Sequence, residues 1–198
     1  MKSRVLNIPN ISKSDGLAEV ARDDAQVLIL GTLPGRVSLE RREYYANPRN
    51  AFWLIMETLF GASRDMSYAD RIHRLKQCGI ALWDVCASAS RSGSRDSKIS
   101  AVVPNDFSAF LSSHSHVKLI CFNGTKADEI YRRRVLPNLA ANFAEIRREI
   151  LPSTGPAYAA MPFKEKLARW SQVLEHALPQ NPAPPTSFRY RVSRLADR

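Results

Sequence analysis

The chain has 198 residues, and its 29 Lys and Arg against 19 Asp and Glu give a net charge of +10 and a pI near 9.9. This length suits one domain with a full hydrophobic core, and no apolar run is long enough for a transmembrane helix. We expect no signal peptide, because the first 16 residues hold no long apolar segment. The charge favours a polyanionic partner, with nucleic acid ahead of a membrane surface, although a basic pI can also serve solubility alone.

The cysteines are scattered singly along the chain, as Cys78, Cys86 and Cys121. Their odd number and the lack of any CxxC pair predict reduced thiols packed in the core of a cytoplasmic protein. In a bacterium, we expect the protein to be associated with the nucleoid. His114 and His116 have no third ligand nearby in the sequence. We therefore expect no metal and no other cofactor.

Apolar runs and helical patterns alternate along the chain. The runs that predict strands are 27–30, 80–85, 117–122 and 144–151. The first three are almost continuously apolar, which is typical of parallel strands buried on both faces. Helical patterns occupy 51–60, 68–77, 105–112, 126–135 and 163–178. This alternation predicts an α/β fold with a central, mainly parallel four-stranded sheet.

The composition divides the chain into three parts. We expect an N-terminal extension over 1–24, the α/β domain over 25–178, and a flexible basic tail over 179–198. The tail is rich in proline and then in arginine, and proline at that density cannot continue a helix.

Ligands of open α/β sheets bind at the carboxyl ends of the strands, so the loops after those ends should carry the function. These loops read GTLPG, CASASRSGSRDS, NGTK and PSTGPAYA. The first has neither the P-loop nor the GxGxxG pattern, and it predicts a rigid turn that brings backbone N–H groups close to a ligand. Ser38, just beyond it, is a candidate donor to phosphate, as are Arg49 and Arg91 by residue type.

The stretch YYANPRNAFW, residues 44–53, combines aromatic rings with an amide. Tyr44 and Tyr45 could stack on a flat ligand. Asn50 has two interpretations, which the residues alone leave open. It orients a water or contacts a base edge, or it caps the helix expected to begin at Ala51.

Several of these motifs together resemble the uracil-DNA glycosylase superfamily, near its mismatch-specific branch and nearest its hypoxanthine-DNA glycosylase branch. The matching stretches are GTLPG, YYANPRNAFW, LWDVCASASRSGSRDSKI, CFNGTKA and LPSTGPAYAAMPFKEKLARW, in the family's order over about 27–174. The resemblance implies a three-layer α/β/α sandwich that flips a damaged nucleotide out of DNA and hydrolyses its N-glycosidic bond.

The resemblance also implies roles for individual residues. Asn50 matches the asparagine given a catalytic role in the hypoxanthine branch, and Asp84 is either a proton acceptor or a strand-end cap. The implied base pocket consists of Gly31, Thr32, Leu33, Pro34, Gly35, Tyr45, Trp83 and Asn123, of which Asn123 could instead only turn the chain. Ser153 should hold a phosphate, and Thr154, Gly155 and Pro156 should wedge into the gap left by the flipped base.

Two positions depart from the pattern of many branches, because Leu33 and Leu151 replace polar residues. Neither leucine can activate water, so we expect Asn50 to act by positioning rather than by proton abstraction. The sequence thus favours a monofunctional DNA glycosylase for deaminated bases, hypoxanthine ahead of uracil, acting as a monomer on double- or single-stranded DNA and not at a membrane. The alternatives are a DNA-binding relative with weak or no catalysis, and an unrelated α/β enzyme acting on a nucleotide.

Overall fold

The computed structural model describes residues 12–91 and 99–178. Within these residues a four-stranded sheet has the order β3-β2-β6-β7, and every neighbouring pair is parallel. Its strands are β2 (Val27–Gly31), β3 (Ile80–Asp84), β6 (Leu119–Asn123) and β7 (Arg147–Leu151). The predicted parallel sheet is therefore confirmed.

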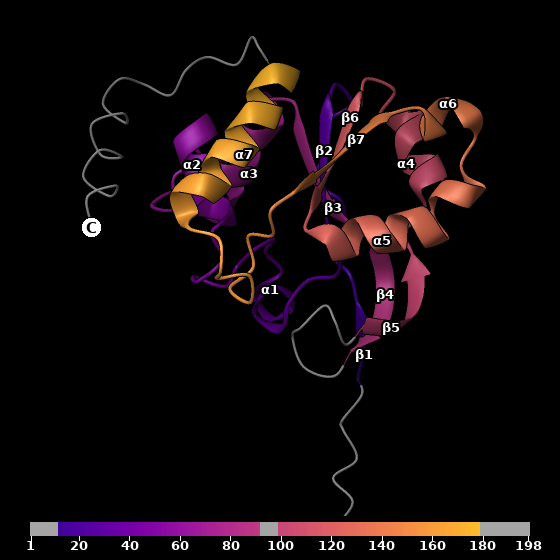
Figure 1. Cartoon of the computed structure of the whole chain (residues 1–198), viewed down its shortest axis with the longest axis horizontal. Helices are drawn as coiled ribbons and strands as arrows, with labels where there is room; N and C mark the ends of the chain where they lie inside the picture. The colour runs from indigo at the N-terminus through magenta and orange to yellow at the C-terminus, as the bar shows by residue number, and fades with distance from the viewer. Residues whose placement is uncertain (1–11, 92–98, 179–198) are drawn as a thin grey trace, which may run out of the picture.

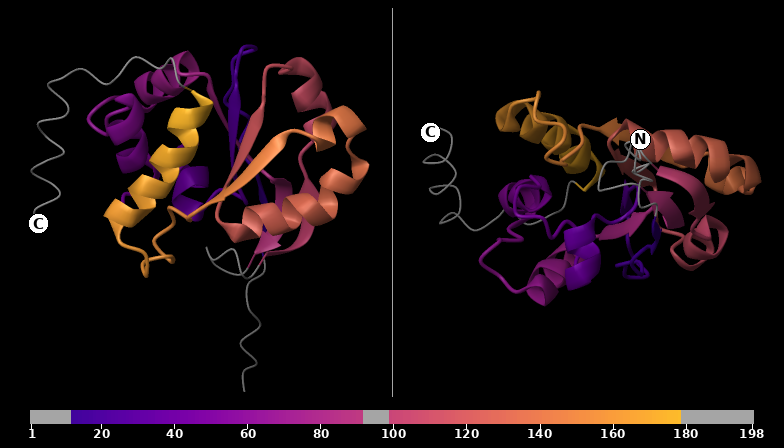
Figure 2. Two further views of the ribbon diagram at one scale, coloured as in Figure 1. Left: turned by 45° about the horizontal axis from the view of Figure 1, so that its top comes forward. Right: turned by 90° about the horizontal axis from the view of Figure 1, so that it is seen from below.

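Helices cover both faces of this sheet (Figures 1 and 2). The helices of the chain are α1 (Arg36–Arg41), α2 (Phe52–Phe60), α3 (Tyr68–Gln77), α4 (Phe107–Ser113), α5 (Thr125–Arg134), α6 (Ala141–Ala144), α7 (Phe163–Ala177) and the 3-10 turn η2 (Leu136–Asn138). Side chains alternate along each strand, so Val27 and Ile29 pack against α2, α3 and α7, whereas Leu28 and Leu30 pack against α4 and α5. The result is the expected three-layer α/β/α sandwich.

A second, antiparallel sheet replaces much of the loop that we expected after β3. It consists of β1 (Ser12–Asp15), β4 (Cys86–Arg91) and β5 (Ile99–Pro104), in the order β1-β4-β5. The sheet lies below the carboxyl ends of the parallel strands in Figure 1. The main-chain N–H of Val85 donates to the Gly31 carbonyl over 2.9 Å, so the parallel pairing passes directly into β4. The expectation of a plain loop here was wrong, because the serine- and alanine-rich strand β4 is stabilised by hydrogen bonding to β1 on one side and β5 on the other.

The start of the last parallel strand differs from the prediction. The last parallel strand begins at Arg147 and not at residue 144, because residues 141–144 form helix α6 instead. The N–H groups of Phe143 and Ala144 both donate to the carbonyl of Ala140 over 3.0 Å and close this helical turn. The described part of the expected N-terminal extension is attached to the domain, since β1 pairs with β4 and Val20 bridges to Leu82. Residues 1–11 and the tail 179–198 lie outside the described residues.

No helix among the described residues is both long and apolar enough to cross a membrane.

Candidate functional site

The carboxyl ends of the parallel strands meet at one edge of the sheet. The register places Gly31 beside Asp84, and Asn123 beside Leu151. Because β2 and β6 are neighbours, the loops that leave all four strands start within one small region. The sequence motifs that were predicted to act together are therefore adjacent in space.

Gly31, Asp84 and Tyr45 converge at the end of β2. Asp84 is buried, with 3% of its surface exposed. A Cβ atom at Gly31 would overlap the Oδ1 of Asp84 and would lie 3.4 Å from the hydroxyl of Tyr45. Glycine is required here because it lets the carboxylate lie directly against the main chain.

Tyr45 is held in a backbone conformation that is unusual for a non-glycine residue, with φ of 56°. Its ring stacks on Phe52, with centroids 3.8 Å apart and planes at 20°. The preceding residue, Tyr44, is fixed at both main-chain atoms. Its N–H donates to the hydroxyl of Tyr68 over 3.0 Å, and its carbonyl accepts from the indole of Trp53 over 2.9 Å. Helices α2 and α3 thus fix the position of the Tyr45 ring.

Arg71 stabilises this aromatic cluster from the side of α3. Its guanidinium lies 4.5 Å from the centre of the Trp53 ring and pairs with Glu43 over 3.8 Å. Burial, followed by the negative charge of Asp84, raises the pKa of Tyr44 far above its usual range. Tyr44 therefore remains neutral, and its hydroxyl donates to the main-chain carbonyl of Ala18 over 3.1 Å.

Asn50 lies just before Ala51, the N-cap residue of helix α2, and its side-chain amide contacts the start of the helix. Its Oδ1 accepts a hydrogen bond from the N–H of Phe52, the first residue of the helix, over 3.0 Å. Among the hydrogen bonds of the described residues, none uses the Nδ2 of Asn50. Asn50 is thus not the N-cap residue itself, but the oxygen of its amide stabilises the helix N-terminus while the nitrogen can donate to a ligand.

The last motif is joined to the first and third motifs by hydrogen bonds. The Nδ2 of Asn123 donates to the Oγ1 of Thr154, and the N–H of Thr154 donates to the Oδ1 of Asn123, each over 2.8 Å. The carbonyl of Thr154 accepts from the N–H of Ala51 over 3.0 Å. Asn123 thus engages both ends of its amide in holding residues 152–158, which we call the wedge loop.

Not all of the residues that the sequence predicts to enter DNA are exposed in the wedge loop. Thr154 is 1% exposed, whereas Pro156 is exposed and Gly155 half-buried. Ser153 is also half-buried, and its Oγ accepts from the N–H of Gly155 over 3.2 Å. We expect Gly155 and Pro156, rather than Thr154, to enter DNA.

Several other predicted site residues have clear structural surroundings. Ser38 is buried in α1, and its Oγ accepts from the N–H of Ala46 over 3.2 Å, so it holds the chain before Asn50. Trp83 points to the opposite face of the sheet, where its ring lies 5.1 Å from that of Phe110 on α4. Arg49 is exposed.

The first loop is mostly buried. Thr32, Leu33 and Pro34 are buried, and the Thr32 carbonyl accepts from the N–H of Cys86 over 3.1 Å. Gly35 precedes helix α1. The side chain of Arg91, and residues 92–98 of the same segment, lie outside the described residues.

The two leucines that depart from the family pattern both belong to the core. Leu33 is 5% exposed and packs with the α4 and α5 side, while Leu151 is 3% exposed and packs with the α2 and α7 side. Burial explains why apolar residues are stable at these positions. Any chemistry at this site must therefore use other groups.

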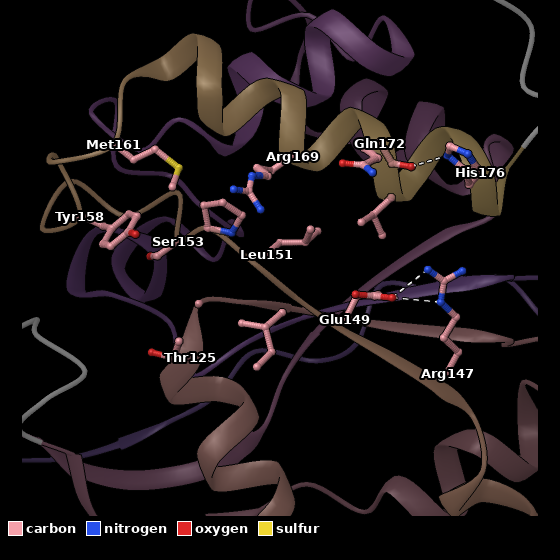
Figure 3. Close-up of a pocket in the computed structure, with 14 residues that line it drawn as sticks. Thr125, Arg147, Glu149, Leu151, Ser153, Tyr158, Met161, Arg169, Gln172 and His176 are labelled. Carbon is pink, nitrogen blue, oxygen red and sulfur yellow. Dashed lines mark hydrogen bonds and ion pairs between the residues drawn. The ribbon is translucent and has the colours of Figure 1, made fainter.

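A groove that the sequence did not predict flanks the site between β7 and α7 (Figure 3). Its volume is about 570 Å³, and it extends from Ser153 and Tyr158 at one end to Arg147 and His176 at the other. Arg169 of α7 also lines it. Gly31, Tyr45 and Asp84 do not line it, so the groove is separate from the point where those residues converge. Within the described ranges, no group of three or more potential ligands could hold a metal ion.

The chain is similar to proteins of one known family. Residues 18–177 match the model of the uracil DNA glycosylase superfamily. The chain is 39% identical over 132 residues to a hypoxanthine DNA glycosylase of Methanosarcina acetivorans, covering 62% of this chain and 84% of that one. It is 36% identical over 118 residues to a protein of the same name from Methanosarcina barkeri, covering 59% of this chain and 75% of that one.

A solved structure shares the fold. The solution NMR structure of a candidate uracil DNA glycosylase from Methanosarcina acetivorans superimposes with a TM-score of 0.71 at 33% sequence identity, covering 84% of this chain and 99% of that one. The chain belongs to the uracil DNA glycosylase superfamily. It is a DNA glycosylase, and its substrate is DNA.

Proposed function

We propose that this glycosylase removes hypoxanthine from DNA by hydrolysing the N-glycosidic bond, which leaves an abasic site. The observation that carries the proposal is the convergence of Gly31, Asp84 and Tyr45 at the end of β2. The two relatives named hypoxanthine DNA glycosylase support the choice of base. Uracil is the second candidate base.

The reaction builds positive charge on the deoxyribose and negative charge on the departing base. In our proposal, the buried carboxylate of Asp84 stabilises the positive sugar, and the amide of Asn50 orients the water that attacks the sugar carbon. An amide does not titrate usefully, so Asn50 contributes position rather than basicity. The proton released by the water is taken up by the departing base or by solvent.

The base must leave the helical stack before it reaches these groups, at a cost of a few kcal/mol. Tyr45 is suited to receive it, because Phe52 covers one face of its ring and fixes the ring plane. Stacking on an aromatic ring returns about 1–3 kcal/mol. Gly155 and Pro156 would fill the gap that the base leaves behind.

We further propose that the enzyme acts as a monomer in the cytoplasm and accepts a deaminated base in both double- and single-stranded DNA. The net charge of +10 supports binding to the phosphate backbone. Binding should accordingly weaken as the salt concentration rises.

Strand cleavage tests the proposal. Duplex oligonucleotides that carry one hypoxanthine, one uracil or no damaged base are incubated with the enzyme and with Asn50→Ala, and abasic sites are then cleaved by alkali. We expect cleavage at hypoxanthine by the wild-type enzyme and much less by the variant. Binding of the hypoxanthine duplex without cleavage would instead support the catalytically inactive alternative.

A further inference from the structure

Lys166 is a buried lysine that neither the family motifs nor the proposed chemistry explains. Only 5% of its surface is exposed, although its neighbours Lys164 and Glu165 are exposed. Lysine is rarely buried to this extent, because its ammonium loses hydration. Burial lowers the pKa of Lys166, and no charged neighbour contributes to that shift. A buried ammonium needs a nearby hydrogen-bond acceptor that stabilises it.

The ammonium of Lys166 contacts the end of the wedge loop. Its Nζ donates to the carbonyl of Tyr158 over 3.2 Å and lies 5.4 Å from the centre of the Tyr158 ring. A hydrogen bond from a charged donor is stronger than one between neutral groups. Lys166 thus attaches the first turn of α7 to the point where the wedge loop ends.

The other end of the wedge loop is attached separately. The indole of Trp170, one helical turn after Lys166, donates to the carbonyl of Pro152 over 3.0 Å, and Asn123 holds Thr154. These contacts fix the loop before Gly155. Beyond Pro156, the hydrogen bond from Lys166 is the only side-chain hydrogen bond to the loop among the described residues.

We propose that Lys166 is a positioning residue that holds the outgoing half of the wedge loop, so that Gly155 and Pro156 project toward DNA in a fixed conformation. The inference rests on the proposed function, because it assigns the loop a role in opening the duplex. A loop fixed at both ends loses less conformational freedom when it enters the duplex, which makes flipping more favourable. Lys166 contacts neither the base nor the reacting bond.

The proposal predicts different effects on duplex and single-stranded substrates, since only the duplex must be opened. In Lys166→Met, which retains the length of the side chain without the donor, we expect single-turnover excision from duplex DNA to fall about tenfold, the value of one charged hydrogen bond. Excision from single-stranded DNA should change less than about twofold. The salt dependence of duplex binding should stay unchanged, because Lys166 touches no phosphate.

Two further variants separate the effect of the position of Lys166 from the effect of losing one positive charge. Lys164→Met removes the same charge from the same helical turn at an exposed position, and it should leave both rates nearly unchanged. Lys166→Arg retains a charged donor and should recover most of the duplex rate. Equal losses on duplex and single-stranded DNA, or equal effects of Lys164→Met and Lys166→Met, would overturn the proposal.

Amide hydrogen exchange tests the anchor without DNA. The N–H of Tyr158 donates to the carbonyl of Gly155 over 3.0 Å, so its protection reports the order of the wedge loop. We expect faster exchange of this amide in Lys166→Met than in the wild type or Lys164→Met. Unchanged exchange would overturn the anchor whatever the activity. Faster exchange in a protein whose wild type excises no base would leave the anchor intact and refute the proposed function instead.

Discussion

The carboxylate of Asp84 lies directly against the main chain of Gly31, where even a methyl group would overlap its Oδ1. The two residues end neighbouring parallel strands and are paired in register. A glycine at this position therefore determines where the buried carboxylate lies. The hydroxyl of Tyr45 approaches the same point from a loop fixed by α2 and α3.

Gly31→Ala should displace Asp84. We expect a loss of about 1–3 kcal/mol in the free energy of unfolding, the usual cost of overpacking. Excision should fall about 10- to 100-fold, because misplaced catalytic groups are costly. Gly35→Ala is the control in the same loop, since a Cβ there would meet nothing within 4 Å and its φ of −71° suits alanine. Urea denaturation and single-turnover excision measure the two effects, and similar behaviour of both variants would contradict the role of Gly31.

Variants of Asn50 should separate its capping from its catalytic contribution. Asn50→Ala removes the acceptor for the Phe52 N–H, and we expect a loss of about 0.5–2 kcal/mol in stability together with the loss of activity. Asn50→Asp retains a capping oxygen but lacks the amide donor, so its stability should match the wild type while excision still falls. Thermal unfolding with parallel activity assays distinguishes these effects. If the Asn50→Ala enzyme retained its activity, Asn50 would have no catalytic role.

Asn123 and Thr154 should be strongly coupled. Asn123→Ala leaves the buried N–H and hydroxyl of Thr154 without their partner, and we expect a loss of about 2–4 kcal/mol in stability. Thr154→Val removes one of the two bonds. The stability loss of the double variant should be smaller than the sum of the two single-variant losses, by about 1–2 kcal/mol. A double-mutant cycle by urea denaturation measures this coupling, and strict additivity would show that the pair does not act as a unit.

Tyr131 should make stability sensitive to alkaline pH. Its hydroxyl is buried without a hydrogen-bond partner among the described residues, and burial raises its pKa from 10.0 to about 12. Because the folded state favours the neutral phenol, the contribution of Tyr131 to the free energy of unfolding is complete below pH 10. It is lost as the pH rises from 10 to 12, at no more than about 1.4 kcal/mol per pH unit.

Tyr131→Phe provides the comparison for this effect. Near pH 8 its free energy of unfolding should equal or exceed that of the wild type by up to about 1 kcal/mol, since an unbonded hydroxyl is removed. Between pH 10 and 12 the variant should lose stability less steeply. Tyr44, Tyr68 and Cys121 have raised pKa values in both proteins, so part of the alkaline loss remains. Parallel curves for the two proteins would contradict the assignment to Tyr131.

The sequence predicted the central sheet and its helices because apolar periodicity reports burial directly. Val27–Gly31 is apolar throughout, and the structure buries every residue of it. The antiparallel strands β4 and β5 escaped prediction because their stability comes from pairing with each other and with β1, far away in the sequence. Local composition does not encode such pairing.

Site residues could be predicted as members of loops, but their contacts could not. Asn123 and Thr154 are 31 residues apart, and nothing in either motif indicates that they bond to one another. Lys166 did leave a signal, because it has the i, i+4, i+8 spacing with Trp170 and Leu174 that marks the buried face of α7. A lysine on such a face indicates a polar partner beneath it.

Hydrolysis of the bond between hypoxanthine and deoxyribose is the reaction that we propose, and release of the intact base measures this reaction without further treatment of the DNA. The enzyme would be incubated with a hypoxanthine-containing duplex, and the products separated by chromatography and mass spectrometry before any alkali treatment. We expect one free hypoxanthine for each unbroken strand that carries an abasic site. Strand breakage without alkali, or bound duplex with no released base, would contradict it.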